Sequence, residues 1–207
     1  MENYWEELVD IIEKSNKSIE LLNGDKNLGI QECKRMHIPQ NTALFIVVSN
    51  SKGIIIDNWI RILGQSYTDN FSIIHFNDCS YIEKYIEGLF IVANDVVGGL
   101  FAININRFRS GKNKVWYFAP DTLEWENLDF SYNEFLAWAL QGNTDDFYSC
   151  MRWKNWKNDL KKIKYFEVVL IYPFLWAKEC NIETANKNIV AFDEVMQINF
   201  DNSEKLG

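Results

Sequence analysis

The residues that most resemble a chemical motif are a glycine pair inside the otherwise apolar stretch ANDVVGGLFAIN. Glycines let backbone N–H groups approach an anion, but phosphate-binding loops follow GxxxxGK[ST] or GxGxxG at the start of a helix. Neither pattern occurs at Gly98 and Gly99, and the later SGKN lacks the upstream glycine and the following Ser or Thr. We therefore interpret Gly98 and Gly99 as a structural turn or bulge, with Asn94 and Asp95 as turn residues before it.

Nucleophilic and metal chemistry find little support in the sequence. The only histidines are His37 and His75, neither lies in an HExxH pattern, and no GxSxG marks a serine hydrolase. The cysteines form no CxxC pair, so they are most simply reduced thiols of a cytoplasmic protein: Cys33, Cys79, Cys150 and Cys180. We expect no catalytic residue, no metal and no cofactor.

Clustered carboxylates offer one route to catalysis. Asp121, Glu124 and Glu126 could supply the acid and base of a glycosidase-like pair. Glu124 and Glu126 also alternate with Leu123 and Trp125, which is typical of a strand with one solvated face. The alternative of a small-ligand-binding protein or a hydrolase that uses these carboxylates stays open.

Charge is distributed unevenly along a chain whose formal net charge is −8. Residues 115–151 contain no Lys or Arg and seven acids, which are Asp121, Glu124, Glu126, Asp129, Glu134, Asp145 and Asp146. The next thirteen residues, RWKNWKNDLKKIK, carry a net charge of +5. Basic and aromatic residues can bind nucleic acid, but the overall negative charge and tryptophans at core spacing argue against it. The acidic segment instead favours a basic protein partner.

Length and composition fit one domain over 1–207, since 207 residues with 47% hydrophobic content suffice for one sizeable core. We expect an N-terminal helix over 1–24, a sheet-rich core over 43–128, a helical part over 131–164 and a C-terminal segment over 165–207. The first ten residues hold four acids, and the most apolar later run, VVLIYPFLWA, is about half a membrane span. We therefore expect neither a secretory signal nor membrane contact.

Several local patterns predict individual elements. The spacing of Trp5, Leu8, Val9 and Ile12 predicts a helix that ends near Leu22. ALFIVV, IIID and WIRIL are typical of strands around a turn at SNSKG, and the segment that follows, with Tyr81 and Ile82 at helical spacing, is ambiguous. LFIVA predicts a strand covered on both faces. After it, Phe101, Ile103 and Ile105 alternate with more polar residues, which predicts a strand with one buried face.

Two helix starts follow. Ser131 and Glu134 match a capping box, which predicts a helix to about Leu140. Thr144 followed by two acids predicts a second, long helix to Ile163, with Trp153 and Trp156 in the core. The final NIVAFDEVMQINF suggests a short strand and a turn of helix.

The stretches FIVANDVVGGLFAIN, VWYFAPDTLEWENLDFSYNEFLAWAL, FYSCMRWKNWK and YPFLW resemble a bacterial family of domains of unknown function. We associate that family with the SUKH superfamily, named for Syd, a herpesvirus protein group and yeast cell-wall regulators. The likeness runs from about Ala43 to the C-terminus. It implies an α+β fold, mainly an antiparallel sheet flanked by helices, with no established catalytic residues.

Many members of that superfamily are immunity proteins that bind toxins used in bacterial competition. The resemblance therefore implies a non-catalytic protein-binding module that inhibits a toxin by binding it, and the acidic segment favours a basic toxin domain as the partner. We expect its binding surface to include Asp95, Asp121, Glu124, Trp125 and Glu126, with the basic segment 152–164 as the other candidate interface.

Overall fold

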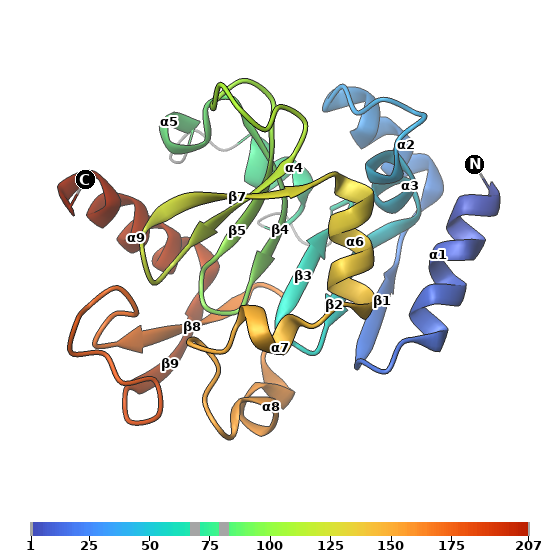
Figure 1. Ribbon diagram of the computed structural model, residues 1–207. Coiled ribbons are helices and arrows are strands. Elements are labelled where there is room, and N and C mark those ends of the chain that lie inside the picture. Colours follow the sequence, from blue (N-terminus) through green and yellow to red (C-terminus); the bar gives the residue numbers. More distant parts are fainter. Residues whose placement is uncertain (1, 67–70, 79–82, 207) are drawn as a thin grey trace.

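A seven-stranded antiparallel sheet forms the centre of the molecule. The structure is a computed structural model that describes residues 2–66, 71–78 and 83–206. Each strand pairs with the next one along the chain, in the order β1 (Ile19–Asn23), β2 (Ser51–Ile56), β3 (Ile60–Leu63), β4 (Leu89–Asp95), β5 (Leu100–Asn104), β6 (Val115–Ala119) and β7 (Glu124–Phe130). The predicted class, α+β with a mainly antiparallel sheet flanked by helices, is confirmed (Figure 1).

Helices and a hairpin cover the two faces of this sheet (Figure 1). Phe101 on β5 packs against Phe135 on one face, with ring centroids 4.8 Å apart, whereas Phe118 on β6 packs against Phe200 on the other at 5.0 Å. The first face carries α1 (Glu2–Lys14), α3 (Ala43–Asn50) and α6 (Tyr132–Gln141); the second carries α9 (Phe192–Leu206) and the hairpin of β8 (Glu167–Tyr172) and β9 (Asn186–Ala191). The remaining helical elements are α2 (Lys26–Arg35), α4 (Ile73–Asn77), α5 (Glu83–Ile86), α7 (Thr144–Phe147), α8 (Trp156–Asp159) and a 3₁₀ turn, Leu160–Lys162.

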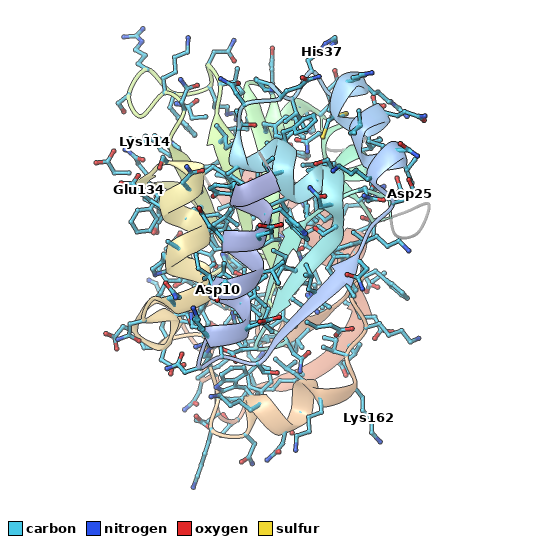
Figure 2. All side chains as sticks on the ribbon, turned by 90° about the vertical axis from the view of Figure 1, so that its right-hand side faces the viewer. Asp10, Asp25, His37, Lys114, Glu134 and Lys162 are labelled. Atoms are coloured by element: carbon cyan, nitrogen blue, oxygen red, sulfur yellow. The ribbon has the colours of Figure 1, made fainter. Side chains whose placement is uncertain are left out.

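The helix α6 begins where the sequence predicts. The Ser131 N–H donates to Glu134 Oε2 at 2.7 Å and the Glu134 N–H donates to Ser131 Oγ at 3.4 Å, so both halves of the capping box form. In Figure 2, α1 and α6 lie side by side in front of the sheet, with Lys114 and Glu134 close together at the start of α6. Ser15 joins the two helical segments by donating from its hydroxyl to the Leu140 carbonyl at 2.7 Å.

The predicted N-terminal helix is too long. It ends at Lys14, and Ile19–Asn23 is the edge strand β1. The periodic residues from Trp5 to Ile12 do lie in α1, but Ile19–Asn23 enters a strand because the edge of β2 supplies backbone partners from Ile56 to Ser51. Tertiary pairing has overridden the local pattern.

The prediction for ALFIVV and SNSKG is also wrong. Ala43–Asn50 is a helix whose N-cap Thr42 accepts from the Phe45 N–H at 3.2 Å, and all but its last residue is buried. A segment buried on all sides shows no periodicity, so short strand and short helix look alike. The hairpin turn lies at Asp57 and Asn58 instead, where φ is +52° and +53°.

The long helix predicted from Thr144 to Ile163 is absent. The described chain there has only α7, α8 and the 3₁₀ turn, and the N-cap of α7 is Asn143. Tyr148, Trp153 and Trp156 surround Trp59 instead, with ring centroids 5.2, 5.9 and 5.1 Å away. The spacing of three to five residues between these aromatic side chains therefore reflects their packing around the Trp59 indole. The predicted burial of Trp153 and Trp156 is confirmed.

Strand predictions further along are partly confirmed. LFIVA lies in β4, which continues to Asp95. The predicted alternation in β5 is wrong, since Asn104 is buried and donates to the carbonyls of Phe108 and Ser110, while Ile105 is 45% exposed. At the C-terminus, β9 is followed by a helix of 15 residues, longer than the single turn expected. The segment that the sequence leaves ambiguous contains the short helices α4 and α5, while Tyr81 and Ile82 lie outside the described residues.

Candidate functional site

Backbone N–H groups of the turn that contains Gly98 and Gly99 bind a carboxylate of the same chain, that of Asp95. Asp95 Oδ1 accepts from the N–H groups of Val97 at 3.0 Å and Gly99 at 2.8 Å, and Oδ2 accepts from the Tyr117 hydroxyl at 2.7 Å. Gly98 has φ +93°, and a Cβ at Gly99 would lie 2.2 Å from Asp95 Oδ2. The prediction that these glycines form a structural turn is confirmed, and their N–H groups bind Asp95 rather than phosphate.

Two predictions for Asp95 are wrong. It belongs to β4 rather than to the turn, and it is 0% exposed, so it cannot meet a partner at the surface. Burial raises the pKa of this carboxyl, and the hydrogen bonds from Tyr117, Gly99 and Val97 oppose that rise. The carboxylate therefore serves the turn between β4 and β5.

Asp121, Glu124 and Glu126 form a surface group, which we call the acidic cluster. Asp121 lies in the turn before β7, and the exposed Glu124 and Glu126 lie on β7, an edge strand. Trp125 is not part of it, because alternate residues of a strand face opposite sides, and its ring packs on Phe118 at 5.5 Å. The structure thus brings together three of the five predicted binding residues.

The charges of Asp121 and Glu124 act on Glu126. The pKa of Glu126 is raised, first by partial burial and then by the charges of Asp121 and Glu124. Cys150 Sγ lies 3.7 Å from Asp121 Oδ2, and burial followed by the Asp121 charge raises the pKa of that thiol. Negative charge is therefore concentrated here.

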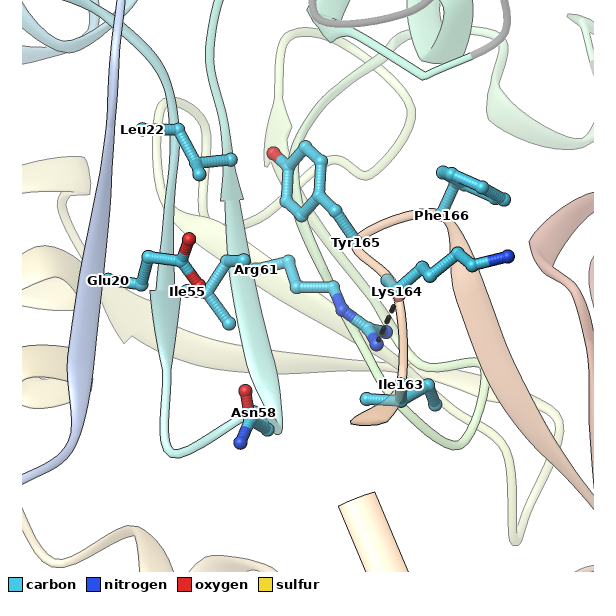
Figure 3. A pocket seen from close by; sticks show the side chains of 9 residues that line it. All are labelled: Glu20, Leu22, Ile55, Asn58, Arg61, Ile163, Lys164, Tyr165 and Phe166. Atoms are coloured by element: carbon cyan, nitrogen blue, oxygen red, sulfur yellow. Dashed lines mark hydrogen bonds between the residues drawn. The ribbon is translucent and has the colours of Figure 1, made fainter. Parts of the chain in front are cut away.

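A second site, which sequence reasoning missed, is a pocket around Arg61 (Figure 3). It lies on the face of the sheet that carries α9 and the β8–β9 hairpin, whereas Glu124 and Glu126 lie on the other face. Cross-strand register places Glu20, Ile55 and Arg61 in one row over β1, β2 and β3. Arg61 is 1% exposed, and its side chain extends from β3 toward the segment 163–166 (Figure 3). The pocket has a volume of about 260 Å³.

The guanidinium of Arg61 has few partners. Its Nη2 donates to the Lys164 carbonyl over a long 3.4 Å. Its Nε and Nη1 are buried and have no hydrogen-bond partner among the described residues. Burial lowers the pKa of Arg61 to about 10, and Tyr165, Asp95 and Glu167 act in the opposite direction. The side chain therefore stays charged at neutral pH. In the sequence, the only signal was an arginine inside the apolar run WIRIL.

The remaining groups weighed for nucleophilic chemistry are poorly suited to it. Burial and then Glu32 raise the pKa of the Cys33 thiol to about 12, which disfavours the thiolate. His75 Nε2 lies 3.2 Å from Asp193 Oδ1, and His37 is exposed with φ +54°. Within the described residues no group of three or more His, Cys, Asp and Glu side chains is arranged to hold a metal ion. Cys79 lies outside them.

Fold and sites together define an α+β domain with a charged surface and a buried cation. The family model described as "Protein of unknown function DUF2625" matches residues 1–195, so the chain belongs to that family. It is 31% identical over 212 residues to an "Uncharacterized protein" of Haemophilus influenzae, covering 98% of this chain and 91% of that protein. It is also 29% identical over 204 residues to the "Putative uncharacterized protein YbfG" of Escherichia coli K12, covering 97% and 92%.

The family assignment confirms the predicted resemblance to a family of unknown function. Membership of the SUKH superfamily stays a prediction. Across the part of the chain that the structure describes, no helix combines the length and apolar character needed to cross a membrane.

Proposed function

We propose that the protein is a non-catalytic binding module whose acidic cluster meets a basic protein partner. The observation that supports this most is the placement of the exposed Glu124 and Glu126 on the edge strand β7, with Asp121 in the turn before it and no Lys or Arg between residues 115 and 151. Such charge accelerates the encounter with a cationic surface and helps to reject acidic ones.

The partner in this proposal is a basic toxin domain, and the chain acts in the cytoplasm as an immunity protein. The resemblance to the SUKH superfamily suggests this role, and the formal net charge of −8 suits it. The other candidate interface has no continuous helix, but Lys154, Lys157, Lys161 and Lys164 are all exposed there. That basic surface would select an acidic partner instead.

A hydrolase is the alternative, because a carboxyl with a raised pKa is what a general acid requires. Glu126 is the residue that would serve. In that case Glu126→Gln would abolish turnover of a glycoside substrate, whereas a binding module would release no product from any glycoside in a chromogenic panel.

Co-expression tests the proposal. The chain carrying an affinity tag is produced together with the product of the adjacent reading frame, and growth and co-purification are both recorded. An immunity protein should relieve growth inhibition by that product and form a stable complex with it. A neighbouring product that is harmless alone and does not co-purify would contradict the immunity role.

A charge-reversed variant then locates the interface. Asp121→Lys, Glu124→Lys and Glu126→Lys together should slow association about tenfold at low salt, with less effect at physiological salt, where the Debye length is about 8 Å. The matched control reverses three exposed acids of α1, Glu6, Asp10 and Glu13, and changes net charge equally. Equal slowing in both variants would mean that overall charge, not the acidic cluster, directs binding. Circular dichroism checks both folds, since acids on an edge strand also discourage strand pairing.

A further inference from the structure

Arg61 is an unusual residue for the middle of a short strand. The neighbouring positions across the sheet are Ile55 on β2 and Asn94 on β4, and β3 is buried throughout. Placing a charge in such an environment is costly unless the charge is paired and its hydrogen-bond donors are used. The chain itself supplies only part of that compensation.

Asp95, the first carboxylate among the charges that act on Arg61, does not hydrogen-bond to it. Asp95 raises the pKa of Arg61 through its charge, but its oxygens accept from Val97, Gly99 and Tyr117. Of the five N–H donors of a guanidinium, one is used here, in the 3.4 Å bond to Lys164. Nε and Nη1 find no acceptor in the described residues, which leaves unused donors on a buried cation that lines the pocket.

We propose that this pocket binds the carboxylate of a small monocarboxylic acid, with Arg61 as the charged recognition residue. A planar carboxylate can take two parallel N–H bonds from a guanidinium, which a neutral ligand cannot match in strength. Leu22, Ile55 and Ile163 line the same pocket and offer apolar contacts to a short hydrocarbon part (Figure 3).

The charges that line the pocket and its volume narrow the class of ligand further. Arg61 is the one buried cation of the pocket lining, while the exposed Glu20 lies at the rim and Lys164 pairs with Glu167 at 3.4 Å. That balance suits a single negative charge and disfavours a dianion such as phosphate. A volume of about 260 Å³ is below the ~300–1,000 Å³ of drug-sized sites, which indicates a ligand of only a few carbon atoms.

A purely structural role for Arg61 makes a different prediction. Asn94 lies directly across from Arg61, and its Oδ1 is also buried without a partner among the described residues. One ordered water between Arg61 and Asn94 would satisfy both groups. In that case added carboxylate would have no saturable effect on the protein.

Ligand-dependent thermal unfolding separates these outcomes. The wild-type chain is titrated with sodium butyrate, with sodium phosphate, and with sodium chloride at matched ionic strength. We expect a saturable rise in Tm with butyrate alone. A saturable rise with phosphate and none with butyrate would overturn the proposal, and so would the absence of any saturable rise.

A blocking variant tests the location without touching Arg61. Ile163→Trp should fill the pocket and abolish the response to butyrate. Ile189→Trp is the matched control, because Ile189 is 52% exposed on β9, does not line the pocket and should leave the response intact. A butyrate response in Ile163→Trp equal to that of wild type would place the binding elsewhere and refute the assignment.

Discussion

Replacing Asp95 tests how the turn between β4 and β5 is held. In Asp95→Ala, the N–H groups of Val97 and Gly99 and the hydroxyl of Tyr117 lose their shared acceptor in a site that is 0% exposed. Each buried donor left without a partner costs about 1–3 kcal/mol, and loss of the buried charge offsets part of the total. We expect the free energy of unfolding to fall by about 3–5 kcal/mol.

Asp95→Asn is the matched variant. The side-chain oxygen still accepts from Val97 and Gly99, and the new amide can donate to the Tyr117 oxygen, so we expect a loss below about 1.5 kcal/mol. Urea denaturation followed by tryptophan fluorescence measures both variants. If Asp95→Asn were as unstable as Asp95→Ala, the charge rather than the acceptor geometry would hold the turn. If Asp95→Ala lost under about 1 kcal/mol, the hydrogen bonds would contribute little.

The same pair gives a pH test with a definite sign. The pKa of Asp95 is raised in the folded state, mainly by burial, so the folded protein keeps this proton at pH values where the unfolded chain has released it. Stability therefore falls as pH rises from the unfolded pKa of about 4 through the folded pKa. Asp95→Asn lacks this titration. The difference in unfolding free energy, wild type minus Asp95→Asn, should decrease across that window and then level off, and an increase would refute a raised pKa.

Two further stability predictions follow from caps and core. Ser131→Ala should cost about 1 kcal/mol in urea denaturation because it removes the N-cap of α6, whereas Ser131→Asp keeps an acceptor and should cost less; no difference between the two would mean that the cap is not used. Trp156→Ala should cost about 3–5 kcal/mol, since this ring is 7% exposed and packs on Trp59. Tyr172→Ala, at a side chain that is 57% exposed, is its control and should change stability little.

Sequence reasoning succeeded where a local hydrogen bond determines structure. The capping box of Ser131 and Glu134 needs only residues three apart, so its pattern can be read without knowing the fold. The turn at Gly98 and Gly99 is similar, because a left-handed φ and a crowded Cβ position both require glycine. The acidic cluster was likewise visible, since strand alternation alone exposes Glu124 and Glu126.

Sequence reasoning failed where the structure of a segment depends on residues that are distant in the sequence. Ala43–Asn50 is buried on nearly every side, so its residues carry no periodic signal for helix or strand. Between Thr144 and Ile163, the spacing of aromatic residues was read as one helical face. That spacing arises because Tyr148, Trp153 and Trp156 all pack against the ring of Trp59, about ninety residues earlier. No window of local sequence contains that partner.

The polar residues inside the central strands show why the pocket was missed. Arg61, Asn94, Asp95 and Asn104 lie in strands and are at most 1% exposed, although polar side chains usually mark turns or solvated faces. The burial of Asp95 and Asn104 is explained by their hydrogen bonds to backbone groups of nearby loops, from the Gly99 N–H to Asp95 and from Asn104 to the Phe108 carbonyl. Arg61 is not explained in this way, because its own chain uses one of its donors and that bond is long. The carboxylate proposed above would use the Arg61 donors that the strand pairing leaves unused.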